Sequence, residues 1–499
     1  MSRRRAAEAV WIGALGLGAL GVGVAAGLDP IPTTMNDFFL PGSQPGAMEE
    51  PFQSSRDACA LCHSSGDDSA TLPYNRWRAS MMGQASRDPI FAACLAVANQ
   101  DAAFAGDLCL RCHTPQGWID GHSTPTDGSA LVGTDFEGVS CSICHRMVDP
   151  VYVSGQSPVE DQGILAALSA IPATPHSGTY IIDPFDRRRG PLNLDQDWPN
   201  GFFWHEWRQS PFHLSSALCA TCHDVSNPVY TRQADGTYAL NALDQAHETQ
   251  NKYDQFPVER TYSEWSRSLF AQGPVDLDGR FGGARAFVSS CQDCHMPTAA
   301  GTACGTFLSP PYRPDVPKHE FAGANTWVLR AVRELYPDAE TGLSAQAVDE
   351  SVARATDMLQ RASDMELTRQ GGSLNVRVIN FSGHKLPTGY AEGRRMWLNV
   401  RFYDAANALM AERGGYDPAT GYCDYHNTKV YEAIFGVDAA VAALTGIPVG
   451  ESFHFVVNNV LLFDNRIPPM GFSNTGFAAV QAAPVGYAYA DGQYWDDTA

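Results

Sequence analysis

The chain has 499 residues, of which 44% are hydrophobic and 18% are charged, and its formal net charge is −21. This composition is typical of a globular protein with about two to four domains. So acidic a chain offers no basic surface for phosphate groups, which excludes nucleic acid as a partner. The acidity either suits a partner with a basic docking surface or only keeps the protein soluble.

The N-terminal segment predicts export from the cytoplasm. Arg3, Arg4 and Arg5 precede an apolar, glycine-rich stretch that runs from residue 9 to residue 28. A basic start followed by an apolar run is typical of a secretory signal peptide, which we therefore expect at residues 1–28. The run is also just long enough to span a bilayer, so the alternative is an uncleaved anchor that associates with a membrane.

Residues 29–56 come next and are rich in Pro, Gly and Ser. Such a composition disfavours regular elements and is typical of connecting segments. We therefore expect a linker at residues 29–56.

The pattern C-x-x-C-H then occurs five times between residues 59 and 295. Random placement of the chain's 13 Cys and 14 His residues would give roughly 0.01 copies. Zinc usually takes two C-x-x-C pairs per site and needs no His after each pair, while a thioredoxin-like dithiol is expected once. The pattern therefore predicts five haem c groups, each held by two thiols with the His beneath its iron. The predicted attachment residues are Cys59, Cys62, Cys109, Cys112, Cys141, Cys144, Cys219, Cys222, Cys291 and Cys294, and the proximal ligands are His63, His113, His145, His223 and His295.

These motifs define a predicted pentahaem region at residues 57–325, made mostly of short helices and loops. A weak repeat, aromatic-x-x-Trp-x-x-Ser, precedes three of the motifs. Spacings of three place its residues along one helical face, so each copy is predicted to be a helix that packs on a haem. The alternative is three chance amphipathic helices. The copies begin at Tyr74, Trp204 and Tyr262.

The periodicity changes after residue 325. Residues 326–367 show helical spacing of apolar residues and are predicted to form a helical connector. In residues 368–499, stretches such as "SLNVRVINF" alternate apolar and polar residues between turn signals. This pattern predicts an antiparallel β-sandwich. The expected fold class is therefore a multidomain α+β protein, with short helices and loops around the haems and a β-rich domain at the end.

Five C-x-x-C-H motifs with aromatic-Trp-Ser helices resemble the multihaem c-type cytochromes, over most of residues 57–325. Segments such as "SMMGQASRDPIF", "SPFHLSSALCATCHDVSNPV", "HEFAGAN" and "GHKLPTGYAEGRRMWL" are similar to an exported bacterial branch of that superfamily. In that branch a β-rich module follows the haem region. The resemblance implies electron transfer in the periplasm or at the cell surface. We expect redox protein partners with basic docking surfaces, and association of copies of the chain through haem contacts.

Five irons need five distal ligands, and six side chains are candidates. His213 ends the second aromatic segment, six residues before its haem motif. Segments similar to "HEFAGAN" follow the haem motifs of the resembling proteins, which favours His319. His384 lies in a predicted turn from which it could reach a haem. Met82 comes two residues after the serine of the first repeat, close to the position of His213, which comes three residues after the serine of the second. For Met82 the alternative is ordinary packing. The full set of candidates is His176, His205, His213, His319, His384 and Met82.

The candidate distal ligands outnumber the irons, which favours six-coordinate haems. Such haems pass electrons without binding a substrate. We therefore expect electron transfer by hopping among five haems, with no catalytic residue. The alternative is a multihaem oxidoreductase in which one iron keeps an open position. A third interpretation gives the β-rich module a role in binding a partner or a surface. Three further cysteines, Cys94, Cys304 and Cys423, are assigned no function.

Overall fold

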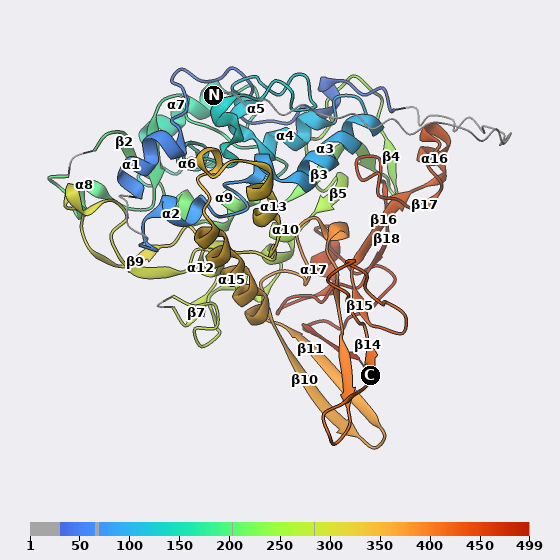
Figure 1. Cartoon of the computed structure of the whole chain (residues 1–499). Coiled ribbons are helices and arrows are strands. Elements are labelled where there is room, and N and C mark those ends of the chain that lie inside the picture. The colour runs from blue at the N-terminus through green and yellow to red at the C-terminus, as the bar shows by residue number, and fades with distance from the viewer. Residues whose placement is uncertain (1–29, 65–68, 202, 284, 499) are drawn as a thin grey trace, which may run out of the picture.

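The structure is a computed structural model that describes residues 30–64, 69–201, 203–283 and 285–498. It is mixed α+β, with short helices and loops throughout the N-terminal part and strands in both parts of the chain (Figure 1). The predicted signal peptide or anchor at residues 1–28 lies outside the described residues. None of the described helices combines the length and the hydropathy that a membrane crossing requires.

The segment expected to be a linker is packed into the protein instead. Ile31 and Leu40 are fully buried. Two buried arginines of the haem motifs hold the segment in place, because Arg111 and Arg146 donate hydrogen bonds to its backbone carbonyls. The linker prediction for residues 29–56 is thus corrected. The Pro and Gly residues supply turns, while the few apolar residues between them fill the core.

Each haem motif lies on or beside a short helix, and most of these helices begin at a serine. The C-x-x-C spacing of three places both thiols on one helical face. Ser54, Ser140, Ser215 and Ser290 cap four of the helices, since each hydroxyl accepts a hydrogen bond from a backbone N–H of the first turn. The motif helices are η2 (Ser55–Cys59) with α1 (Ala60–His63), α4 (Gly106–His113), α6 (Cys141–His145), α9 (Ser216–Ala220) and α12 (Cys291–His295).

The other elements of this part of the chain are short as well, because Gly and Pro interrupt it often. The helices are η1 (Met35–Phe38), α2 (Pro73–Trp77), η3 (Ala85–Arg87), α3 (Pro89–Asp101), α5 (Pro115–Ile119), η4 (Gly133–Glu137), α7 (Val159–Ala167), α8 (Leu194–Asp197), η5 (Pro211–Leu214), α10 (Thr261–Ser266), α11 (Leu269–Gln272) and η6 (Thr306–Leu308). The strands are β1 (Arg187–Gly190), β2 (Glu206–Gln209), β3 (Val225–Arg232), β4 (Tyr238–Leu240), β5 (Gln255–Glu259), β6 (Val275–Asp276), β7 (Phe287–Val288), β8 (Thr298–Gly301) and β9 (Arg313–Pro317). Their sheets are small, with β3 at the centre of one three-stranded sheet between β4 and β5.

Two of the three aromatic repeats are helices that hold a haem motif. In α2 and α10 the tryptophan Nε1 donates to a backbone carbonyl two residues before a motif: Trp77 to Val139, 2.9 Å, and Trp265 to Ser289, 2.8 Å. In both repeats the final serine hydroxyl then donates to the carbonyl of that tryptophan, at 2.7 Å. These helices thus fix where the third and fifth motifs begin.

The helix prediction is wrong for the repeat that starts at Trp204, because this segment forms strand β2. Strand β2 pairs in parallel with β1, from Arg187 opposite Glu206 to Gly190 opposite Gln209. Trp204 is 74% exposed, whereas Tyr74, the equivalent residue of the first repeat, is 5% exposed. Pairing with a neighbouring strand has overridden the local spacing.

The helical spacing after residue 325 corresponds to three helices. The strands that follow do not build the two large sheets of a sandwich. Instead they form four small antiparallel sheets, ordered β10-β11-β19, β12-β15, β13-β14 and β17-β16-β18, so a β-sandwich is not what the strands form. The helices are α13 (Val328–Leu335), α14 (Asp338–Thr341) and α15 (Ala345–Ala362), and later η7 (Ala391–Gly393), α16 (Ala439–Thr445) and α17 (Asn474–Ala478). The strands are β10 (Ser363–Gln370), β11 (Ser373–Asn380), β12 (Met396–Trp397), β13 (Val400–Tyr403), β14 (Leu409–Arg413), β15 (Val430–Tyr431), β16 (Ala433–Val437), β17 (Gly450–Glu451), β18 (Val460–Asp464) and β19 (Trp495–Thr498).

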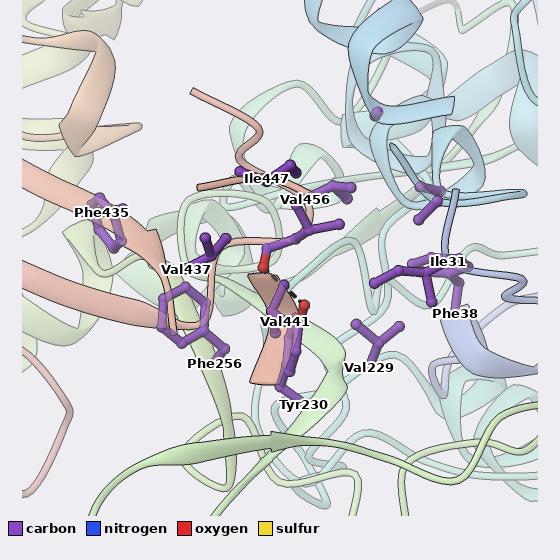
Figure 2. Close-up of a cluster of buried hydrophobic side chains, with 14 of the residues drawn as sticks. Ile31, Phe38, Val229, Tyr230, Phe256, Phe435, Val437, Val441, Ile447 and Val456 are labelled. Carbon is purple, nitrogen blue, oxygen red and sulfur yellow. Dashed lines mark hydrogen bonds between the residues drawn. The ribbon is translucent and has the colours of Figure 1, made fainter. Parts of the chain in front are cut away.

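One apolar cluster joins the two parts of the chain (Figure 2). It brings Ile31 from the N-terminal segment and Phe256 from β5 together with Phe435 and Val456 from the C-terminal part. Tyr230 adds a hydrogen bond across the same boundary, 2.9 Å from its hydroxyl to the carbonyl of Val457. Burial of each large apolar side chain stabilises the fold by about 1.5–3 kcal/mol. The C-terminal part therefore shares its core with the haem region.

Candidate haem-binding sites

The cysteines of the five motifs are available for covalent attachment, because all 13 cysteines of the chain are free thiols. Burial raises the pKa of Cys109 and of Cys144 to about 12, so both thiols are protonated at neutral pH. Among the described residues, no three His, Cys, Asp or Glu side chains are arranged to hold a metal ion.

The proximal imidazoles of three motifs are oriented by backbone carbonyls. A carbonyl oxygen can only accept a hydrogen bond, so the Nδ1 atom that faces it carries the proton. The lone pair then resides on Nε2, the atom that would bind an iron, which is the usual arrangement of a metal-bound histidine. The Nδ1 to oxygen distances are 2.8 Å from His63 to Ala303, 2.7 Å from His145 to Arg189 and 2.7 Å from His295 to Ala322.

The fourth motif differs, because a carboxylate lies beside its imidazole. Nδ1 of His223 is 3.4 Å from Oε1 of Glu259. Burial on its own lowers the pKa of His223, but the Glu259 carboxylate outweighs burial and the pKa is raised. Burial likewise raises the pKa of Glu259, and the contact with His223 and a hydrogen bond from Thr261 bring it below its usual value. Protein surrounds the His223 ring, yet 52% of the side-chain surface is accessible, which leaves room for a bound group.

The fifth motif has an imidazole facing it from the C-terminal part. The rings of His295 and His384 lie 6.5 Å apart, centroid to centroid, and 16° from parallel. Two imidazoles on opposite sides of one iron would be about 6.3 Å apart, given a metal–nitrogen bond of about 2 Å on each side. Nδ1 of His384 lies 3.0 Å from the carbonyl of Lys385, so Nε2 again keeps the lone pair. This pair fits the two axial ligands of one haem.

The third motif has two candidate partners. The ring of His319 lies 6.2 Å from that of His145 at 30°, and the ring of His213 lies 5.6 Å from it at 10°. Nδ1 of His319 faces the carbonyl of Pro317 at 3.2 Å, so its Nε2 is the ligating atom. His213 has the opposite tautomer, because its Nε2 lies 3.0 Å from the carbonyl of Cys144. Its Nδ1 is buried and has no hydrogen-bond partner among the described residues, so it could bind only through Nδ1.

His205 lies in the same neighbourhood. Its Nδ1 is 3.2 Å from the carbonyl of Glu206, and its charge would interact with those of His63 and Arg188. His63 and His145, the proximal residues of the first and third motifs, also interact with each other electrostatically. Three candidate distal imidazoles thus gather around two proximal ones.

The candidate ligands are neutral at physiological pH, which is the form that binds metals. Burial lowers the pKa of His145 and of His384 to about 4, and that of His213 and of His319 to about 3. Desolvation disfavours the charged imidazolium, so each ring enters the fold without a proton to displace.

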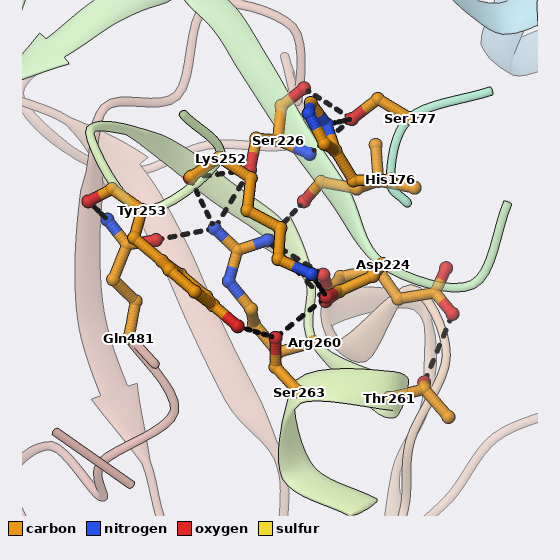
Figure 3. Close-up of polar contacts among 12 residues, drawn as sticks. His176, Ser177, Asp224, Ser226, Lys252, Tyr253, Arg260, Thr261, Ser263 and Gln481 are labelled. Atoms are coloured by element: carbon orange, nitrogen blue, oxygen red, sulfur yellow. Dashed lines mark hydrogen bonds and ion pairs between the residues drawn. The ribbon is translucent and has the colours of Figure 1, made fainter. Parts of the chain in front are cut away.

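Two sequence candidates lie in other surroundings. His176 is 1% exposed and belongs to the polar network of Figure 3, where its Nδ1 lies 3.1 Å from the Ser177 hydroxyl and its ring also bonds the backbone of Gln250. These contacts fit a packing role for His176, and its assignment as an iron ligand stays a prediction. Met82 packs against the apolar cluster that contains Phe91, which is the ordinary packing alternative.

The network of Figure 3 was not evident in the sequence. Its centre is Asp224, the residue after His223, which is completely buried. Its Oδ2 accepts hydrogen bonds from Lys252 Nζ at 2.5 Å and from Ser263 at 2.7 Å, and Arg260 lies 3.8 Å from its Oδ1. Two cations thus balance one buried carboxylate and hold strands β3 and β5 against α10. In the sequence Asp224 is only an Asp that follows a motif; it can be identified as the centre of a network once its burial is known.

Cysteines of different motifs lie near one another, which places the candidate sites side by side. Cys59 interacts with Cys141, Cys112 with Cys222, and Cys219 with Cys291. Two of these contacts are built alike. A serine hydroxyl at the start of one motif helix accepts the backbone N–H of the first cysteine of the other motif: Ser55 from Cys141 and Ser216 from Cys291, both at 3.1 Å.

No protein-family model matches the chain, and no curated protein matches it in sequence. Among solved structures, the chain is similar to a penta-heme cytochrome c552 from Thermochromatium tepidum, with a TM-score of 0.46 and 17% identity. That similarity covers 84% of this chain and 86% of the other. The assignment of haem sites therefore rests on the motifs and contacts of this chain itself.

Proposed function

We propose that the chain is a multihaem c-type cytochrome that transfers electrons among five covalently bound haems. The observation that carries the proposal is the proximity of the motifs. Ser55 and Ser216, at the start of two motif helices, accept the backbone N–H groups of Cys141 and Cys291 of other motifs, and the thiols of three pairs of motifs interact. Haem groups, when bound there, supply one-electron chemistry.

The chain's own residues would hold and tune these groups. Carbonyls fix the imidazole tautomers, while the serine caps and the two tryptophan-anchored helices fix the motif helices. The contacts order the sites: the first beside the third, the second beside the fourth, and the fourth beside the fifth. Cys144 of the third motif interacts with Cys219 and Cys222 of the fourth. This interaction links the third site to the fourth, so all five sites are connected. Adjacent sites favour short hops.

We also propose that the protein works outside the cytoplasm, in the periplasm or at the cell surface, and exchanges electrons with basic redox proteins. The basic and apolar start of the sequence supports export, and the net charge of −21 supports an oppositely charged partner.

The test is the haem content of the exported protein. Pyridine haemochrome assay and intact mass should give five covalently bound haems per chain. A matched variant, Cys144→Ser, should leave one haem with a single thioether bond. Two or three haems, or zinc at the same thiols, would contradict the proposal.

A further inference from the structure

Next to His384 lies a buried cation that the haem motifs do not explain. The side chain of Lys385 is completely buried, and its Nζ lies 2.8 Å from Oδ2 of Asp464. Its backbone N–H donates to Oε2 of Glu264 at 3.0 Å. Asp464 ends β18, and Glu264 belongs to α10, the aromatic helix that holds the fifth motif. A single residue therefore joins the His384 loop to both parts of the chain.

Arg466 completes a network of two cations and two carboxylates. Its guanidinium lies 2.7 Å from Asp464 and 3.1 Å from Glu264, and its side chain is 6% exposed. Thr388, on the far side of the loop, donates to Glu264 at 3.0 Å. Because desolvation of buried ions offsets most of their attraction, such a network adds little stability; it makes one geometry strongly preferred.

The loop is also tied at its start. The side-chain amide of Asn380, at the end of β11, donates to the carbonyls of His384, Ile467 and Pro468 at 2.8–3.1 Å. Its oxygen accepts the hydroxyl of Ser382 at 2.7 Å. The backbone on both sides of His384 is thus fixed to the core rather than free to move.

We infer that Lys385, Asp464, Arg466 and Glu264 form a positioning device that holds His384 opposite His295, so that the C-terminal part supplies the sixth ligand of the fifth haem. The inference rests on the proposed function. It gives the C-terminal part a role in the redox chemistry itself. Glu264 is central, because it lies on the helix whose Trp265 anchors the fifth motif and also bonds the His384 loop. The proximal and distal sides of one site are therefore tied to the same helix.

The test replaces the cation and follows the spin state of the irons in the full, haem-loaded chain. In Lys385→Met, one of the five ferric haems should become high-spin by electron paramagnetic resonance, and the reduced protein should bind one equivalent of carbon monoxide. His384→Ala should give the same result. The matched control is Lys429→Met, which removes another lysine of this part; its Nζ lies 3.1 Å from Asp496 and also bonds the Tyr487 hydroxyl. It should leave the spin state of every haem as it is in the wild type.

If Lys385→Met fails to fold, Glu264→Gln keeps the size of the side chain and should still shift the reduction potential of one haem. Folded Lys385→Met and Glu264→Gln proteins with unchanged spin states and potentials would overturn the inference. So would a His384→Ala protein whose irons all remain low-spin. A wild-type chain without five haems would instead contradict the proposed function, so the two failures are distinguishable.

Discussion

Nδ1 of His223 lies 3.4 Å from a carboxylate oxygen of Glu259, whereas His63, His145 and His295 face carbonyl oxygens. A negative partner makes an imidazole a stronger electron donor to a metal than a neutral carbonyl does. The iron of the fourth site should therefore be harder to reduce than it would be with a carbonyl partner.

Glu259→Gln should move the reduction potential of one haem to a more positive value and leave the other four in place. Spectroelectrochemical titration measures this. Glu259→Asp, which keeps the charge, should restore most of the original potential. Equal shifts in all five haems would indicate a general change in charge rather than a proximal effect.

The three imidazoles near the first and third motifs lead to a counting prediction. Two irons take two distal ligands, so only two of the variants His205→Ala, His213→Ala and His319→Ala should produce a high-spin haem. The ring distance of 6.2 Å favours His319 as one of them. Electron paramagnetic resonance of the three proteins would show which two imidazoles bind these irons. A high-spin haem in all three would mean that one imidazole binds a different iron.

Met82 should behave as a packing residue. Met82→Leu keeps the volume and should leave the visible spectrum and all potentials unchanged, while Met82→Ala should lower the free energy of unfolding by about 1–2 kcal/mol. Chemical denaturation and near-infrared spectroscopy measure the two effects. Loss of a methionine–iron charge-transfer band in Met82→Leu would show instead that its sulfur binds an iron.

Arg111 should stabilise the N-terminal segment. It is 1% exposed and donates to the carbonyls of Gly178, Leu40 and Pro41. Arg111→Ala removes the side-chain donor of the Gly178 and Pro41 carbonyls, at about 1–3 kcal/mol for each buried group, while the Leu40 carbonyl keeps the Gln44 amide. Limited proteolysis should then cut within residues 30–56, whereas the wild type should resist cleavage there. The exposed Arg369 is the control, since it also donates to a carbonyl but Arg369→Ala should change neither property.

In the wild-type protein the haems of the first, third and fifth sites should be low-spin, because each of these sites has a second imidazole near its proximal one. At least one motif, the fifth, has a second imidazole at the distance that two axial ligands require. A stoichiometric high-spin haem that binds nitrite or carbon monoxide would favour the alternative, an oxidoreductase with one open iron.

The sequence by itself predicted the attachment chemistry. A C-x-x-C-H motif is local: one helical turn brings the thiols to one face, and a capping serine starts that turn, so five sites could be predicted without any knowledge of the fold. All three aromatic repeats were predicted as helices, and two of them form helices for the same local reason. The prediction is wrong for the third, because β1 pairs with the segment after Trp204.

Only the tertiary structure decided which residues face one another. His384 and His295 are separated by 88 intervening residues of chain, and nothing in the spacing of either reports a ring distance of 6.5 Å. His176 looks equivalent to the other candidates in the sequence, and only the structure places it in a buried polar network beside Ser177. The roles of Glu259 and Lys385 could not be predicted from the sequence for the same reason, because both depend on long-range contacts. An iron ligand, or the charge that tunes it, is defined by long-range packing, and packing depends on all of the elements at once.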